Sequence, residues 1–222
     1  MDLDRAFLRS PETAKAHVEE ILKSLGDVEY SFFEPSDFTA STLPEIPPTF
    51  GYMCCPRTIS DLSTKISLGY IGPRVRSIIE QATFPILIPA ASYKPWENLL
   101  CFFGGSPYAL NVAECAIDLS EASHLPLKLF TEGEGKGQEW YQSQMKGTRL
   151  SRGIQEGRVE WMFFEKGDLK EHLYDVPHDA LIVIGSHGHK TAKELFFGSK
   201  TELVQTVLPN PMVVIGPNFR AD

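Results

Sequence analysis

The chain has 222 residues, 42% of them hydrophobic, and its formal net charge at pH 7 is −8. A chain of this size can bury one large core or two small ones, and its acidic balance excludes nucleic acid and anionic membranes as expected partners. The first residues are polar, and no apolar run approaches the roughly 18 residues that cross a bilayer. We therefore expect a cytoplasmic protein whose four cysteines are reduced thiols.

The apolar pattern predicts strands that alternate with helices along the chain. In the first half we expect a helix over residues 11–25 and short strands at 28–33, 53–55 and 86–88. In the second half we expect strands at 99–103, 127–131, 159–164, 180–184 and 212–215, with helices at 109–120, at 139–155 and from 199 onward. Strands separated by helices at this spacing are typical of βαβ units, which build a parallel sheet covered on both faces.

Two segments of the first half recur in the second half. Residues 28–37 match residues 159–168, and residues 72–89 match residues 198–215, so the offset falls from 131 to 126. We expect the five extra residues of the first copy in the proline-rich segment 43–48. The sequence thus predicts a tandem repeat, in which the first copy has no counterpart of residues 99–131. We divide it into a truncated, degenerate repeat at 1–90, a linker at 91–96 and a complete domain at 97–222.

A spaced set of glycines follows the strand predicted at 180–184. Two residues separate Gly185 from Gly188, and nine more precede Gly198 and Ser199, where a helix begins. Glycine permits close backbone approach, and the free N–H groups at a helix start attract anions. The glycines are therefore either a phosphate-binding loop or simply a tight turn. Ser199 also starts the S-x-x-E pattern of a helix capping box, which is compatible with both readings.

With this GxxG-x9-GS pattern between two strands, residues 97–217 resemble the universal stress protein family. The resemblance implies an α/β fold, a doubly wound parallel five-stranded sheet of order 3-2-1-4-5 (Rossmann-like), preceded here by a partial copy. Ligands of such sheets bind at the switch between strands 1 and 4. The implied ligand is a nucleotide, first of all ATP with Mg²⁺, and the implied function is stress response and regulation. The residues that would line this site are Phe102, Gly104, Thr131, Gly185, Gly188, His189, Gly198, Ser199, Lys200 and Thr201.

Three of these residues have an alternative interpretation. ATP-binding members of the family usually have an Asp where this chain has Gly104, and losing a charge-assisted hydrogen bond costs about 1.5–3 kcal/mol. The nucleotide could then be bound weakly, exchanged for another, or not bound. Lys200 could meet a phosphate or remain a solvated surface lysine, and the Thr201 hydroxyl could reach the same anion or face solvent.

Other readings of the chain follow from the same residues. His187 and His189 have no metal-ligand spacing around them, so we expect no metal site and no catalytic residue, with slow ATP hydrolysis at most. An interaction or dimerisation module of the same fold is the alternative function. An enzyme that uses His187 or His189 on a phosphorylated substrate is a third.

The first copy is expected to have a structural role. It has no GxxG, and Pro73 stands where the second copy has Ser199. We expect Ile86–Ile88 to pair with Met212–Val214 across a pseudo-twofold axis. Because the missing strands would leave edges exposed, we also expect a homodimer, formed through the last strands, through the incomplete first domain, or through both.

Overall fold

The computed structural model describes residues 11–32, 51–57, 71–90, 94–165, 167–187 and 199–221. Contacts divide the chain into two compact units, Met1–Thr42 and Leu43–Asp222. The division falls inside the first repeat, because the later elements of that repeat join the sheet of the second.

Within the first unit, the described residues form a single helix, α1 (Pro11–Ser24), which confirms the helix predicted at 11–25. The ammonium of Lys15 lies 5.0 Å from the centre of the Phe32 ring. The strand predicted at 28–33 is wrong over the described residues 28–32, which have no regular structure. A strand requires a neighbour to satisfy its N–H and C=O groups, and the described residues of this unit include no second strand.

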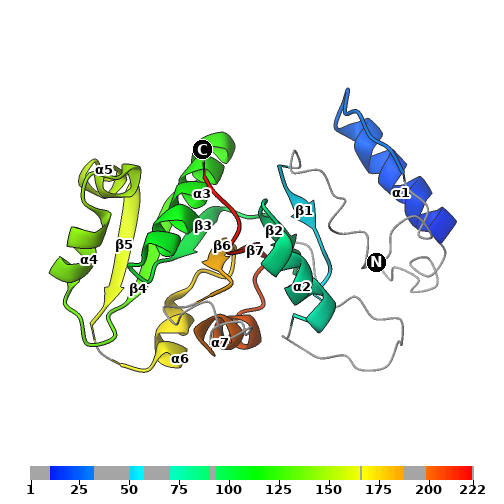
Figure 1. The fold of residues 1–222 in the computed structure, drawn as a ribbon. Coiled ribbons are helices and arrows are strands. Elements are labelled where there is room, and N and C mark those ends of the chain that lie inside the picture. The colour runs from blue at the N-terminus through cyan, green and yellow to red at the C-terminus, as the bar shows by residue number, and fades with distance from the viewer. Residues whose placement is uncertain are drawn as a thin grey trace. The chain divides into compact units, whose positions relative to one another are not determined.

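The second unit is built on one seven-stranded sheet (Figure 1). Its order is β1-β2-β7-β6-β3-β4-β5. The strands are β1 (Met53–Cys54), β2 (Ile86–Ile88), β3 (Asn98–Phe102), β4 (Leu127–Glu132), β5 (Val159–Phe164), β6 (Ala180–Gly185) and β7 (Met212–Ile215). The strands of the second repeat, β5-β4-β3-β6-β7, are all parallel. The predicted order 3-2-1-4-5 is therefore confirmed.

Helices cover both faces of this sheet and enclose two apolar clusters. On one face, α3 (Pro107–Ser123), α4 (Gln138–Met145) and α5 (Arg149–Gln155) pack on inward side chains such as Leu99 and Cys101. On the other face, α2 (Pro73–Gln81), α6 (Leu169–His172) and α7 (Ser199–Val207) pack on side chains such as Leu100 and Ile182. A short 3₁₀ turn (Leu173–Asp175) extends α6. Side chains alternate across a strand, so a strand covered on both faces is apolar throughout.

The long helix predicted at 139–155 is wrong, because the structure has two helices there. Between α4 and α5, Gly147 has a φ of +81°, a left-handed conformation that an α-helix cannot contain. Thr148 then caps α5 by accepting a hydrogen bond from the Ser151 N–H at 3.2 Å. Both helices contribute buried residues to the same apolar cluster, Tyr141 and Met145 from α4 and Leu150 from α5.

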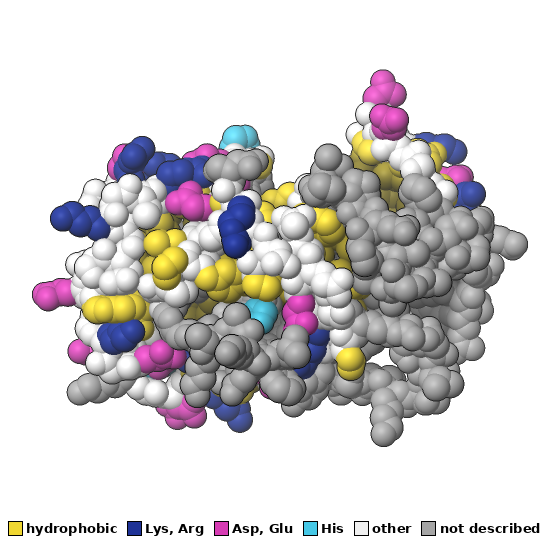
Figure 2. Space-filling view, in the orientation of Figure 1, with side chains coloured by type: hydrophobic (Ala, Val, Ile, Leu, Met, Phe, Trp, Pro, Cys, Tyr) yellow, Lys and Arg dark blue, Asp and Glu magenta, His cyan; other side chains and the backbone are white. Residues whose placement is uncertain are grey.

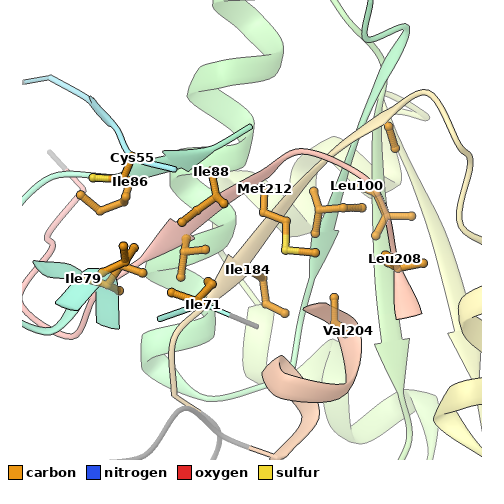
Figure 3. Close-up of a cluster of buried hydrophobic side chains, with 14 of the residues drawn as sticks. Cys55, Ile71, Ile79, Ile86, Ile88, Leu100, Ile184, Val204, Leu208 and Met212 are labelled. Carbon is orange, nitrogen blue, oxygen red and sulfur yellow. The ribbon is translucent and has the colours of Figure 1, made fainter. Parts of the chain in front are cut away.

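The two repeats meet where β2 runs antiparallel to β7. Leu87 lies opposite Val213, and its neighbours Ile86 and Ile88 lie opposite Val214 and Met212. Leu87 and Val213 are 126 residues apart, which is the offset of the repeat, so a pseudo-twofold axis passes between them. The predicted pairing is confirmed residue by residue. Figure 3 shows Ile88 beside Met212 and Ile86 beside Cys55, within one apolar cluster.

The register also corrects the position of the extra residues in the first copy. Cys54 of β1 pairs with Leu87 as Val183 of β6 pairs with Val213, which gives an offset of 129 at β1. Each fall of one in the offset between the two copies marks one extra residue in the first copy. The offset falls from 131 to 129 before β1 and from 129 to 126 between β1 and Gly72, so only two of the five extra residues precede β1. The other three lie between β1 and α2, outside the proline-rich segment.

Strand β7 has a neighbour on each side, β6 and β2. A second chain therefore finds no free edge on β7 unless β2 moves away. Both routes to a homodimer, through the last strands and through the incomplete first repeat, stay predictions.

Candidate functional site

The switch point of the sheet lies between β3 and β6. After β3 the chain enters α3 on one face, whereas after β6 it reaches α7 on the opposite face (Figure 1). Connections that leave in opposite directions open a crevice beyond the carboxyl ends of the two strands. Phe102 and Gly185 end these strands, so the structure brings two of the predicted site residues to the crevice.

Gly185 is required here for a close contact with Tyr108. A Cβ on Gly185 would lie 2.6 Å from Cε1 of Tyr108, in the first turn of α3. The Tyr108 hydroxyl donates to the carbonyl of Ile215 and accepts from the Ser186 N–H at 3.0 Å. Burial raises the pKa of Tyr108, so the hydroxyl keeps the proton that it donates. The pattern of glycines alone did not reveal this role of Tyr108.

The Ser186 N–H is the first amide of the glycine loop, and it is already engaged. Besides Tyr108 it reaches the carbonyl of Ile215 at 2.8 Å. The Ser186 hydroxyl in turn lies 2.7 Å from Nδ1 of His187. The amide therefore joins the end of β6 to β7 and to α3, and the imidazole nitrogen contacts the neighbouring hydroxyl. An anion would have to be bound by groups further along the loop.

Helix α7 begins directly beside the end of β6. The buried Thr201 hydroxyl donates to the carbonyl of Gly185 at 3.1 Å. The expectation that this hydroxyl meets an anion or solvent is not met in this arrangement, because its proton points to Gly185. Its effect is to place the N-terminal turn of α7, where backbone N–H groups point out of the helix, at the crevice.

Lys200 reaches across the crevice to the loop after β4. Its ammonium forms an ion pair with Oε1 of Glu134, and both side chains are about 40% exposed, Lys200 at 44% and Glu134 at 39%. Since β3 lies between β6 and β4 in the sheet, the pair spans the open end of β3. Lys200 is thus paired with a carboxylate, and a phosphate that binds its ammonium would have to compete with Glu134. Sequence patterns gave no signal for Glu134, which has a left-handed φ of +43°.

A row of aromatic rings fills the carboxyl end of the sheet beside Phe102. The Phe102 ring lies 4.7 Å from that of Phe130, and Phe130 lies 4.8 Å from Phe164. The imidazole of His172 stacks on Phe164 at 4.3 Å. Nδ1 of His172 lies 2.7 Å from Oε2 of Glu132, with both side chains largely buried. The chain's own rings therefore occupy this end of the apolar face where α6 packs.

Thr131, the other residue expected to border an adenine, points the opposite way. Its side chain is fully buried, and its hydroxyl accepts a hydrogen bond from Nε1 of Trp161 at 3.0 Å. Because neighbouring side chains on a strand alternate, Thr131 lies under α4 and α5 while Phe130 faces α6. Thr131 can border a ligand only through its backbone.

Gly104 follows β3 in a tight turn into α3. The next residue, Gly105, has a φ of +79°, and a Cβ there would lie 2.6 Å from the Trp140 ring. Ser106 then caps α3 by accepting from the Ala109 N–H at 3.1 Å. The turn places no carboxylate at the end of β3, so the position of the usual Asp has no charge in this structure.

Part of the predicted site lies outside the described residues. This holds for Gly188, His189 and Gly198, and for the side chain of Ser199, whose backbone begins α7. Among the described residues, no group of three or more His, Cys, Asp or Glu side chains is placed to hold a metal ion. On the face seen in Figure 2, basic and acidic side chains are interspersed over the part that carries α3, α4 and α5. One such group joins Arg149 to Glu114, Asp118 and Glu121.

Solved structures with a similar fold include universal stress proteins. A universal stress protein from Archaeoglobus fulgidus DSM 4304 aligns with a TM-score of 0.63 and 16% sequence identity, over 100% of this chain and 81% of that chain. A protein of unknown function from Pseudomonas aeruginosa PAO1 aligns with a TM-score of 0.61 and 13% identity, over 95% and 79%. No family model and no curated protein sequence matches the chain. The resemblance drawn from the glycine pattern is thus confirmed at the level of the fold, which is that of universal stress proteins.

Over the part of the chain that the structure describes, a search for membrane-spanning helices finds none with the necessary length and apolar character.

Proposed function

We propose that this chain is a regulatory protein of the universal stress type that binds one nucleotide, ATP first of all, in its second repeat, and acts in the stress response of the cytoplasm. The observation that carries the proposal is the start of α7. The Thr201 bond to Gly185 positions this helix start beside the switch point, and Lys200 adds a positive charge in the same turn. Helix N-termini beside glycine loops favour phosphate groups.

The described residues fit the phosphates better than the rest of the nucleotide. Lys200 and the helix start can hold phosphates, whereas Gly104 supplies no carboxylate for ribose or Mg²⁺. Glu132 lies against His172, and Glu134 lies against Lys200. We therefore propose binding with modest affinity, in which the phosphates displace Glu134 from Lys200. We also propose binding without rapid turnover, because the turn at Gly104 supplies no carboxylate that could act as a general base.

Calorimetric titration of the full chain with ATP and with AMP, both in the presence of Mg²⁺, tests the proposal. We expect a saturable signal with one ATP per chain, and weaker binding of AMP because it has fewer phosphates. Lys200→Ala should weaken ATP binding about 3–10-fold. One partly exposed charge contributes roughly 1 kcal/mol to binding, and this energy corresponds to that change in affinity. Gly188→Val should abolish it.

Lys128→Ala is the matched control. Lys128 also forms an ion pair with a glutamate, Glu160, but on β4 and β5 and away from the crevice. It should leave ATP affinity unchanged. If neither nucleotide gives heat with the native chain, the nucleotide proposal is wrong.

The second candidate function is a module of the same fold that binds a partner rather than a nucleotide. The engaged Ser186 amide, the Lys200–Glu134 pair and the uncharged turn at Gly104 favour it. A homodimer through the incomplete first repeat belongs to this candidate. Nucleotide absorbance in the freshly purified native protein would argue against it, and light scattering at micromolar concentration would detect the dimer.

A further inference from the structure

The last helix and the last strand of each repeat form the surface that joins the two repeats. These elements are structurally equivalent in the two repeats, but their residues differ. We call this surface the repeat interface, formed by β2 and α2 of the first repeat against β7 and α7 of the second. Its pseudo-twofold axis relates each residue of α2 and β2 to the residue 126 positions later, whereas the offset at β1 is 129. In a symmetric dimer, residues beside such an axis would face copies of themselves.

One ion pair crosses the repeat interface between equivalent positions. Nη1 of Arg76 lies 2.8 Å from Oε1 of Glu202, and the two residues are 126 positions apart. Both side chains are at least partly buried, with exposed fractions of 21% and 37%. Two second repeats placed in the same geometry would oppose Glu202 to Glu202, and two first repeats would oppose Arg76 to Arg76. Each like pairing replaces an attraction by a repulsion.

The ends of the two helices are held across the interface, but by different residues. The Arg57 guanidinium donates to the carbonyls of Gln205 and Asn210 at 3.1 and 3.2 Å, at the C-terminal end of α7. In the other direction, the Asn218 side-chain amide donates to the carbonyl of Glu80 at 2.8 Å, at the end of α2. Cationic and amide donors stabilise the last carbonyls of a helix. Because Ser186 occupies the position equivalent to Arg57, a pair of second repeats would lose the bonds to Gln205.

A steric difference points the same way. A Cβ on Gly216 would lie 1.9 Å from the carbonyl oxygen of Ile79, so α2 touches the end of β7 as only glycine permits. The equivalent of Gly216 in the first repeat is Ala90. Two first repeats in this geometry would set the Ala90 methyl against the Ile79 carbonyl. Helix α2 can approach this closely only where the residue after the last strand is a glycine, as it is in the second repeat.

We propose that the repeat interface is selective for unlike repeats: the surface of β7 and α7 accepts the first repeat of this chain and rejects a copy of itself. Charge and helix capping disfavour a pair of second repeats, whereas charge and steric fit disfavour a pair of first repeats. The chain therefore closes on itself, and a second copy can reach this surface only by exchanging its own first repeat. This inference does not depend on nucleotide binding.

Charge reversal in the full chain tests the selectivity. Arg76→Glu and Glu202→Arg should each lower the melting temperature by about 2–4 °C, because each opposes like charges. The double variant R76E/E202R restores opposite charges and should recover most of that loss. A double variant no more stable than the less stable single variant would overturn the proposal.

Co-expression of differently tagged full-length chains tests the choice of partner. A chain with R76E and a chain with E202R repel internally, but exchange of repeats between them restores two opposite-charge pairs. They should co-purify, whereas two native chains, or two R76E chains, should not co-purify through this surface. Lys128→Glu, which reverses a charge away from the interface, is the control and should behave as the native chain. Equal co-purification of native and complementary pairs would contradict the proposal.

Discussion

Replacing Gly216 by alanine should weaken the packing of the two repeats. The added Cβ would lie 1.9 Å from the carbonyl oxygen of Ile79 and 3.1 Å from its carbon, so backbone must move by about 1 Å or more. Overpacking of this kind costs about 1–3 kcal/mol. The φ of Gly216 is not left-handed, so alanine also gains about 0.4–1 kcal/mol by restricting the unfolded chain. The steric cost exceeds this gain, and we expect the free energy of unfolding to fall by about 1–2 kcal/mol.

Thermal unfolding followed by circular dichroism measures this loss. For a chain of this length, it lowers the melting temperature by roughly 2–8 °C. Gly51→Ala is the matched control, because Gly51 has no left-handed φ and no atom of the described residues lies within 4 Å of the place that its added Cβ would take. Gly51→Ala should be neutral or slightly stabilising. If Gly216→Ala is as stable as Gly51→Ala, the close contact between α2 and the end of β7 does not exist.

Three further predictions concern a buried hydroxyl and the thiols. Tyr108→Phe removes the hydroxyl that joins Ser186 to Ile215 and should lower the free energy of unfolding, measured by urea denaturation, by about 1–2 kcal/mol. Tyr174→Phe, at an exposed ring, is the control and should have no effect. Equal stability of both variants would contradict the role of the Tyr108 hydroxyl. Among the thiols, Cys54 is exposed while Cys55, Cys101 and Cys115 are buried, so a thiol reagent should modify one cysteine quickly in the native chain and all four after denaturation. Cys54 is exposed, but neighbouring atoms partly desolvate its sulfur and raise the pKa of the thiol above its usual value, so its rate of modification should keep rising through about pH 9. A plateau below about pH 8 would be inconsistent with that environment.

Much of the sheet could be predicted because its signals are local and repeated. The strands of the second repeat are apolar runs bounded by turn residues, and the pairing of Leu87 with Val213 follows from the repeat offset. The break between α4 and α5 was missed although Gly147 lies at it, because a glycine within a helical pattern is often tolerated.

The candidate site was harder to predict because its contacts join distant positions. Nothing in the sequence relates Tyr108 to Gly185 or Glu134 to Lys200; these pairs meet only after β3, β4 and β6 are placed side by side. The direction of Thr131 is different, since alternation along β4 already places it opposite Phe130. The sequence therefore contains the signal for the direction of Thr131.

A crystal structure of the full chain grown with saturating ATP and Mg²⁺ tests the central claim most directly. Our account predicts one nucleotide per chain, with phosphates at the first turn of α7, the Lys200–Glu134 pair opened, and β2 still paired with β7. An empty crevice with Lys200 still bound to Glu134, or a nucleotide bound elsewhere, would contradict it.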